Sequence, residues 1–506
     1  MNTSPPPVAK TSAGAVRGRV EGGLAVFRGI PFGRPPVGED RFAEPRPPLP
    51  WDGVRDALAF GPKPPQTALA PGTPVEPAGS PDWLTVNVWT PAPDRAARRP
   101  VMVWIYGGAY ATGSSAEPGY DGGRLARERD MVIVTFNHRV GLEGFGQLAG
   151  APANRGLLDQ VAALHWVREN IAAFGGDPGQ VTVFGESAGA GSIAALLTMP
   201  RAKGLFHRAI AQSVPGAFFS GALAADIAGV LVEPLGLAPT AAALAAVDPD
   251  KLTESATAAM PSTRQHVDRW GMVAYAVTPF APVVDGEILP EYPWRALAEG
   301  AGREVPLITG HNRDEFRLFV TLSGRSGKIT AERTAATLRL FGPGPEPETG
   351  YRAAYPGASD ETLHELVQSD WYFRMPTLHL AQAQLTGGGQ AHLYELTWAA
   401  PANGGALGAC HALDVPLTFG DFSGIGNEWF GVGSAPEAEA LSAHIRSAWT
   451  SFAVDGLPGW PAYDLDRRLT RVLDAEPATA PYPEEASRRL WEHHTFDTLP
   501  LLTGDR

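Results

Sequence analysis

The hydrophobic positions of the chain form short continuous runs, separated by stretches with helical periodicity. Residues 101–105 (VMVWI) and 131–136 (MVIVTF) are runs typical of strands in sheets that are buried on both faces. Further short runs of this kind occupy residues 181–184, 209–213, 305–309 and 392–396. Each run predicts a buried strand.

Apolar residues spaced by three or four positions predict helices between these strands. One such helical face would carry Leu157, Val161, Leu164, Val167 and Ile171. A last helix is expected over about residues 436–452, before Gly456. Strands that alternate with helices predict an α/β fold, in which a mainly parallel sheet is covered by helices on both faces.

Two long segments, residues 220–275 and 321–374, are rich in alanine and other helix formers. Loops of this length without secondary structure are uncommon in compact domains. We therefore expect both segments to be helical insertions that pack above the sheet and shape the site below them.

Composition and charge narrow the possible classes of function. Hydrophobic residues make up 44% of the 506 residues, which is typical of a globular chain and not of a disordered one. The formal net charge is −13 and no long basic run occurs, so a nucleic-acid partner is not expected. No apolar stretch reaches the ~20 residues that a membrane helix requires.

The cysteine count and the N-terminal stretch bear on the cellular compartment. The single cysteine, Cys410, cannot form an internal disulfide. Residues 1–10 lack the basic start, apolar stretch and small-residue cleavage site of a secretion signal. We therefore expect a cytoplasmic protein. A monomer is compatible with the sequence, which carries no readable signal of oligomeric state.

The strongest motif is Gly-Glu-Ser-Ala-Gly at residues 185–189, between a predicted strand and a predicted helix. Small residues around Ser187 let the backbone make a tight, strained turn, so that the serine projects from the end of the strand. Taken in isolation, this five-residue pattern fits an ordinary glycine-rich turn as well as it fits a nucleophile motif. The strand-turn-helix context favours a nucleophile at Ser187.

Acyl transfer by a serine also needs backbone N–H donors for the oxyanion. One donor usually comes from the residue after the nucleophile, and others come from a glycine loop after an earlier strand. Here Tyr106-Gly107-Gly108-Ala109 follows the strand at residues 101–105. A simple turn is the alternative for a glycine pair taken alone, but the two signals support each other.

A serine nucleophile needs a base and an acid, which follow it along the chain in this class of fold. The strand at residues 305–309 leads into a segment with two acids, Asp314 and Glu315. The strand at residues 392–396 leads into a loop of small residues that holds His411. The adjacent Cys410 is better explained as a small buried hydrophobe than as a nucleophile.

Over nearly its whole length the sequence resembles the type-B carboxylesterases, a family with bacterial members. The resemblance begins with FRGIPF at residues 27–32 and LTVNVWTP at residues 84–91, and it is densest in FGGDPGQVTVFGESAGA at residues 174–190. It implies the α/β-hydrolase fold: a central, mainly parallel sheet with helices on both faces and large helical insertions over the active site.

The resemblance also implies a role for each candidate residue. Ser187 would be the nucleophile, Glu315 the acid and His411 the base. The N–H groups of the oxyanion hole would be those of Gly107, Gly108 and Ala188. Several positions depart from the family pattern, chiefly Tyr106, where histidine is usual, and Asp414, where glutamate is common. The Tyr106 change leaves open what supports the oxyanion loop, because the phenol must find another partner.

Other residues resemble pocket or supporting positions of the family. Phe319 resembles an acyl-pocket position, and Tyr110 and Phe219 are further pocket candidates, with a place in the core as the alternative for each. Glu186 and Ser213 resemble residues that support the triad, with a purely structural hydrogen bond as the alternative.

These residues predict a serine carboxylesterase that hydrolyses short- or medium-chain or aryl esters through an acyl-enzyme, with terephthalate-type oligoesters as one class. The expected partner is a small-molecule ester, with no metal or cofactor. An amidase or thioesterase with the same triad is one alternative, and a non-catalytic binding protein of this fold is another. The oxyanion loop and His411 must meet in one site, so residues 1–506 are expected to form a single domain.

Overall fold

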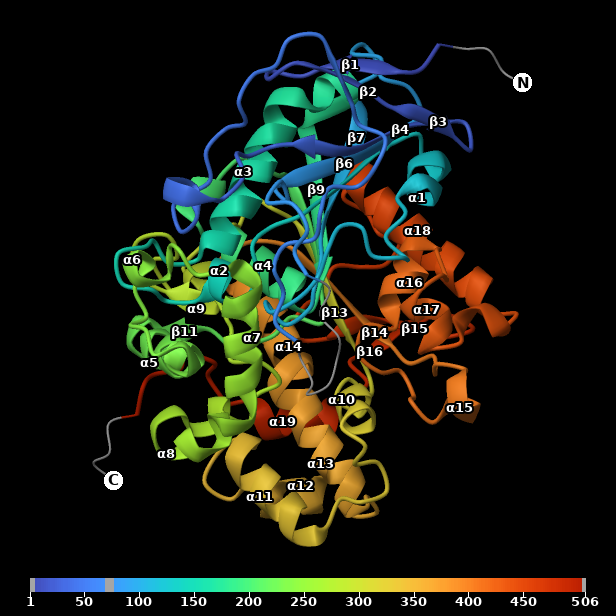
Figure 1. Ribbon diagram of the computed structural model, residues 1–506. Coiled ribbons are helices and arrows are strands. Elements are labelled where there is room, and N and C mark those ends of the chain that lie inside the picture. The colour runs from blue at the N-terminus through green and yellow to red at the C-terminus, as the bar shows by residue number, and fades with distance from the viewer. Residues whose placement is uncertain (1–4, 69–76, 503–506) are drawn as a thin grey trace.

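The computed structural model describes residues 5–68 and 77–502, and Figure 1 shows their arrangement. Residues 1–4, the start of the stretch considered above for a secretion signal, lie outside the described residues. Within the described part, one large sheet has eleven strands in the order β16-β15-β14-β13-β10-β9-β7-β8-β6-β4-β3.

The centre of the sheet is parallel, as the alternation of strands and helices predicts. Its parallel strands are β7 (Arg99–Ile105), β8 (Val132–Phe136), β9 (Gly176–Glu186), β10 (Arg208–Gln212), β13 (Leu307–Asn312), β14 (Ala391–Leu396) and β15 (Leu469–Leu473). Antiparallel strands extend it at the edges: β3 (Arg19–Glu21), β4 (Leu24–Pro31), β6 (Thr85–Thr90) and β16 (Ala478–Pro481). The sheet of this α/β-hydrolase fold is therefore mixed, with parallel strands at its centre and antiparallel strands at its edges.

Alternate residues of the central strands pack on opposite faces of the sheet. In β7, Val101, Val103 and Ile105 join one hydrophobic cluster, while Met102 and Trp104 join the other. A strand buried on both sides needs an apolar residue at every position, which explains the continuous run in the sequence.

Helices cover both faces. The first cluster is completed by helices that include α3 (Arg155–Asn170), α4 (Ala188–Leu196), α9 (Pro293–Ala298) and α14 (Met375–Thr386). The second is completed by α1 (Gly123–Glu128), α16 (Asp414–Phe419) and α18 (Ala438–Asp455). Helix α4 begins two residues earlier than the sequence pattern predicts. The reason is that the chain reverses its direction at the single residue Ser187, so the next residue, Ala188, already has helical backbone angles.

The two long insertions are largely helical, and most of their helices lie in the lower half of Figure 1. The first contains α5 (Gly221–Val232), α6 (Ala241–Leu244), α7 (Pro249–Ala259) and α8 (Val267–Trp270). The second contains α11 (Ala331–Phe341), α12 (Pro347–Ala354) and α13 (Asp360–Ser369), with α10 (Arg317–Leu322) at its start. A π-helical turn, Asp370–Arg374, joins α13 to α14.

Shorter elements complete the chain. They are β1 (Val8–Lys10), β2 (Ala15–Arg17), β5 (Val54–Asp56), β11 (Phe219–Ser220), β12 (Val283–Val284), α2 (Gly141–Phe145), α15 (Ala402–Gly405), α17 (Ile425–Glu428) and α19 (Glu485–Trp491). Across the described ranges, no helix combines the length and the apolar character that crossing a bilayer demands.

Candidate active site

Ser187 lies at the sharp turn between β9 and α4. Its backbone has φ 55° and ψ −124°, a conformation that residues other than glycine rarely adopt. The flanking glycines are required by close packing, because a Cβ at Gly185 would lie 2.6 Å from the carbonyl oxygen of Ile105, and one at Gly189 would collide with the same oxygen. The G-x-S-x-G pattern therefore lets the turn fit against β7.

Ser187, His411 and Glu315 form a continuous hydrogen-bonded chain. Nε2 of His411 lies 2.9 Å from Oγ of Ser187, and Nδ1 lies 2.6 Å from Oε2 of Glu315. All three side chains are largely shielded from solvent, and Ser187 is 9% exposed. They come from three separate loops, which follow the carboxyl ends of β9, β13 and β14.

The structure distinguishes the two neighbouring acids. Glu315 faces the histidine, and its other oxygen accepts hydrogen bonds from Ser213 Oγ at 2.6 Å and from the N–H of Asn312 at 2.8 Å. Asp314 points elsewhere: it accepts from the N–H of Ala409 and pairs with Arg317 at 2.9 Å. The geometry supports Glu315 as the partner of the histidine and gives Asp314 the task of holding the histidine loop.

Glu186 is a second carboxylate beside the histidine. Its Oε1 lies 3.1 Å from Nε2 of His411 and has no other partner among the described residues. Burial raises the pKa of Glu186 to about 8. Burial opposes the charging of His411, but Glu186 and Glu315 outweigh it and raise the pKa of the imidazole to about 9. A positive charge on His411 is thus strongly favoured by its surroundings.

The three expected oxyanion donors surround the serine. Gly107 packs so closely that a Cβ on it would lie 3.1 Å from the Cβ of Ser187. Gly108 follows it with φ 104°, and Ala188 is the first residue of α4. In the described part of the chain, the N–H groups of Gly107, Gly108 and Ala188 donate to no protein acceptor. These N–H groups are available for an anionic oxygen.

An apolar pocket opens onto Ser187. All three pocket candidates, Tyr110, Phe219 and Phe319, line it. The first insertion contributes Val273 to the remaining wall, and the second contributes Trp371, Tyr372 and Phe373. The rest of the wall includes residues just after the first insertion, which are Ala276, Val277, Thr278 and Phe280, together with Pro215 and Ala217. No charged side chain lines this pocket within residues 5–68 and 77–502, so it suits an uncharged ligand.

Sequence reasoning missed the aromatic residues of the π-helical turn. Trp371, Tyr372 and Phe373 are buried and line the pocket. The turn is fixed by its two ends, because Asp370 and Arg374 are both fully buried and form an ion pair of 3.1 Å. The signal in the sequence was three consecutive aromatic residues in an otherwise alanine-rich insertion.

Two other reactive side chains close to His411 in the sequence, those of Cys410 and Asp414, are held in the protein interior. Asp414 is buried and accepts hydrogen bonds from Gln212 Nε2 at 2.7 Å and from the Tyr394 hydroxyl at 2.8 Å. Cys410 is fully buried, and burial raises the pKa of its thiol, which disfavours the thiolate. Neither group contacts Ser187.

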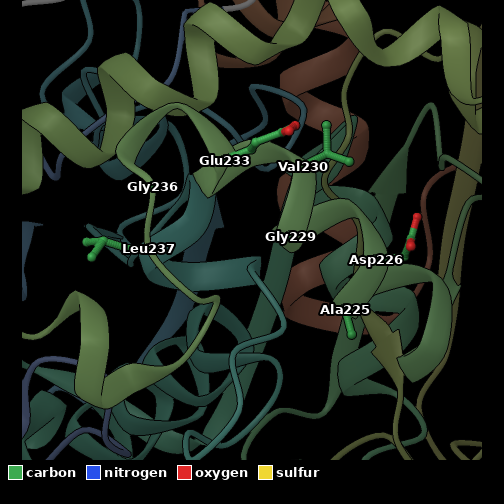
Figure 2. Close-up of a pocket in the computed structure, with 7 residues that line it drawn as sticks. All are labelled: Ala225, Asp226, Gly229, Val230, Glu233, Gly236 and Leu237. Atoms are coloured by element: carbon green, nitrogen blue, oxygen red, sulfur yellow. The ribbon is translucent and has the colours of Figure 1, made fainter.

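A second hollow lies on the surface beside α5. Figure 2 shows its lining residues, which are Ala225, Asp226, Gly229, Val230, Glu233, Gly236 and Leu237. The Asp226 carboxylate is already occupied, since it pairs with Arg269 at 2.6 Å and accepts from Trp270 Nε1 at 2.6 Å. The lining contains no nucleophile with a neighbouring base, so this hollow does not compete with the Ser187 site.

The chain is also similar to proteins of known activity over most of its length. The model of the carboxylesterase family matches residues 5–342. The para-nitrobenzyl esterase of Bacillus subtilis (strain 168) is 38% identical over 495 residues, which cover 95% of this chain and 98% of that protein. The phenmedipham hydrolase of Pseudarthrobacter oxydans is 34% identical and covers 93% and 96% of the two chains. Among solved structures, carboxylesterase Est55 of Geobacillus stearothermophilus matches with a TM-score of 0.84 at 35% identity, over 96% of this chain and 99% of that one.

Proposed function

Because the chain belongs to the carboxylesterase family and is a carboxylic ester hydrolase, we propose that it acts through an acyl-enzyme on Ser187. The hydrogen-bonded chain from Ser187 through His411 to Glu315 carries this proposal. A serine hydroxyl is a weak nucleophile at neutral pH, and a positioned imidazole supplies the base that it needs.

Acylation begins when Ser187 Oγ attacks the ester carbonyl carbon. Nε2 of His411 takes the hydroxyl proton, and the carbonyl oxygen becomes an oxyanion that the N–H groups of Gly107, Gly108 and Ala188 stabilise. As the tetrahedral intermediate collapses, the bond to the leaving alkoxide breaks and the imidazolium returns the proton to it. The products of this half-reaction are an alcohol and an acyl ester of Ser187.

Deacylation repeats these steps with water as the nucleophile. His411 takes a proton from water, the hydroxide attacks the acyl carbonyl, and Ser187 leaves with the proton that the imidazolium returns. Throughout, Glu315 holds the Nδ1 proton and stabilises the positive charge on the ring. Ser213 and Asn312 orient Glu315 for this task through the hydrogen bonds to its other oxygen.

The pocket supports a preference for uncharged acyl and aryl groups. Aromatic residues, among them Phe319, Tyr372 and Phe373, make up a large part of its lining, and aliphatic residues such as Val273 and Val277 contribute to the rest. We propose short- and medium-chain esters and aryl esters as substrates, with terephthalate-type oligoesters among the aryl class. Comparing bis(2-hydroxyethyl) terephthalate with para-nitrophenyl butyrate tests the last point: no hydrolysis of the terephthalate ester would remove that class.

Labelling with an alkyl fluorophosphonate tests the nucleophile. Wild-type protein is expected to take one label on Ser187, and Ser187→Ala is expected to lose both the label and the hydrolysis of para-nitrophenyl butyrate. Ser255→Ala is the matched control, since Ser255 is also buried but its hydroxyl donates to the carbonyl of Leu231 at 2.8 Å, outside the Ser187 site, and it should keep both. Normal ester hydrolysis by Ser187→Ala would contradict the proposal. Butyryl anilide and butyryl thioester substrates measured beside the ester distinguish an amidase or a thioesterase.

A further inference from the structure

The oxyanion loop is attached at both ends to one neighbouring segment, the loop after β8 that leads into α2. At the beginning of the oxyanion loop, Tyr106 contacts His138. At its end, the carbonyl oxygen of Tyr110 accepts a 2.7 Å hydrogen bond from the N–H of Gly141. The donor residues Gly107 and Gly108 lie between these two attachments.

The attachment at Tyr106 is made by both the ring and the hydroxyl. The hydroxyl accepts from the backbone N–H of His138 and donates to the backbone carbonyl of the same residue, each at 3.1 Å. The two rings stack, with centroids 4.4 Å apart and planes 11° apart. Both side chains are buried, so a phenylalanine here would leave the His138 N–H and carbonyl unpaired away from water.

The segment that receives Tyr106 is itself rigidly held. Arg139, the next residue, donates from its backbone N–H and from Nε to Asp159 Oδ2, at 2.9 Å each, and from Nη2 to Oδ1 at 2.7 Å. Its remaining guanidinium nitrogen donates to two carbonyls near the N-terminus of the protein, those of Arg41 and Ala43. Arg139 and Asp159 are fully buried. Tyr106 is therefore bonded to a segment that Arg139 ties to Asp159 of α3.

The oxyanion loop needs this support because its own backbone is strained. Gly108, Ala109 and Tyr110 all have positive φ angles, of 104°, 56° and 57°. Ala109 and Tyr110 are not glycines, so their conformation persists only where the surroundings impose it. Among the described residues, the donor N–H groups of Gly107 and Gly108 have no protein partner that would hold them.

We propose that Tyr106 is a positioning residue of the oxyanion hole, and that its hydroxyl, through His138, sets the direction of the Gly107 and Gly108 N–H groups. This inference rests on the proposed function, because it assigns a role in the same reaction. Displacement of these donors would weaken the binding of the oxyanion in the transition state and leave the binding of the uncharged ester in the pocket unaltered.

Tyr106→Phe tests the inference, since it keeps the stacked ring and removes only the hydroxyl. With para-nitrophenyl butyrate, kcat is expected to fall by about tenfold or more, which is less than the loss of a whole oxyanion donor, while KM changes by less than about twofold. An alkyl trifluoromethyl ketone, whose adduct with Ser187 carries an oxyanion, should bind more weakly by the same factor as kcat falls.

Tyr292→Phe is the matched control. It also removes a buried hydroxyl that donates to a backbone carbonyl, that of Gly216 at 2.9 Å, and it lies outside the oxyanion loop. We expect it to lower thermal stability with kcat and ketone affinity preserved. If folded Tyr106→Phe matches this control in both readouts, the inference is wrong.

A second variant applies if Tyr106→Phe does not accumulate as folded protein. A Cβ at Gly113 would collide with the Tyr106 ring, so Gly113→Ala should shift that ring and lower kcat and ketone affinity together. Unchanged values in folded Gly113→Ala would overturn the inference. A failure of the proposed function can be distinguished from a failure of this inference. If the proposed function is wrong, the alkyl fluorophosphonate will not label Ser187 in the wild-type protein.

Discussion

The ring of Phe373 stacks on the imidazole of His411, with centroids 4.1 Å apart and planes 28° apart. Phe319 also contacts the imidazole, with a centroid distance of 5.3 Å and a tilt of 39°. The two phenylalanine rings are nearly parallel to each other, at 12°. The imidazole of the proposed base is therefore covered by aromatic carbon that comes from a π-helical turn and from α10, and neither element carries a residue of the proposed triad.

Replacing Phe373 with leucine should slow the reaction. The face of an aromatic ring stabilises an adjacent cation by roughly 0.5–1.5 kcal/mol, so loss of the stack should lower kcat by about two- to tenfold. Steady-state kinetics with para-nitrophenyl butyrate measure this effect. Phe319→Leu is the comparison, and its smaller overlap with the imidazole predicts a smaller loss of kcat. Equal losses in the two variants would mean that stacking is not the cause.

Glu315→Gln should reduce kcat by about two to four orders of magnitude, since a neutral amide cannot stabilise the imidazolium or fix its tautomer. Asp314→Asn should keep most of the activity, because Asp314 faces Ala409 and Arg317. Comparison of kcat/KM for the two variants measures the difference. A larger loss in Asp314→Asn would assign the acid role to that residue.

Glu186→Gln should move the acid limb of the pH–rate profile to lower pH. The proposed mechanism needs neutral His411, so we expect activity to fall as the pH drops through the pKa of this imidazole, which its neighbours raise to about 9. Glu186, Glu315 and Asp414 all favour the charged ring, and the substitution removes the carboxyl group 3.1 Å from Nε2, which is ionised above its own raised pKa of about 8. We expect the limb in kcat/KM to shift by about one pH unit or more. Asp314→Asn is the control, and an unmoved limb in Glu186→Gln would refute the explanation.

Asp159→Asn should destabilise the protein strongly, because it leaves the fully buried Arg139 guanidinium without its carboxylate. Breaking a buried pair costs about 3–5 kcal/mol of unfolding free energy. Asp56→Asn breaks the exposed pair with Arg17, whose side chains are 51% and 44% exposed, and should cost less than about 1 kcal/mol. Urea denaturation of both variants measures the difference, and similar midpoints would contradict this account.

Local patterns in the sequence were sufficient for the parts of the site that one segment encodes. The turn at Ser187 and the strand before it are encoded within about a dozen residues, and the apolar runs place β7, β9 and β13. The resemblance to the family was needed to choose between Asp314 and Glu315, because both residues leave the same strand end and only the folded loop separates their directions.

Other features depend on contacts between distant segments. Phe373 packs on His411 because the whole second insertion folds back over the sheet, and no spacing of residues records that contact. The partner of Tyr106 could not be predicted from the sequence either, since the phenol bonds to the backbone N–H and carbonyl of residue 138, which any amino acid except proline could supply.

The order of the proposed triad along the chain has a consequence for biosynthesis. His411 follows Ser187 by 224 residues and Glu315 by 96 residues, and its loop leaves β14, which pairs with β13. A nascent chain still lacking this loop holds the proposed nucleophile and acid but not the proposed base. We therefore expect hydrolysis to begin only after β14 has paired with β13 and its loop has formed, so that the return of esterase activity during refolding reports this late step of sheet assembly.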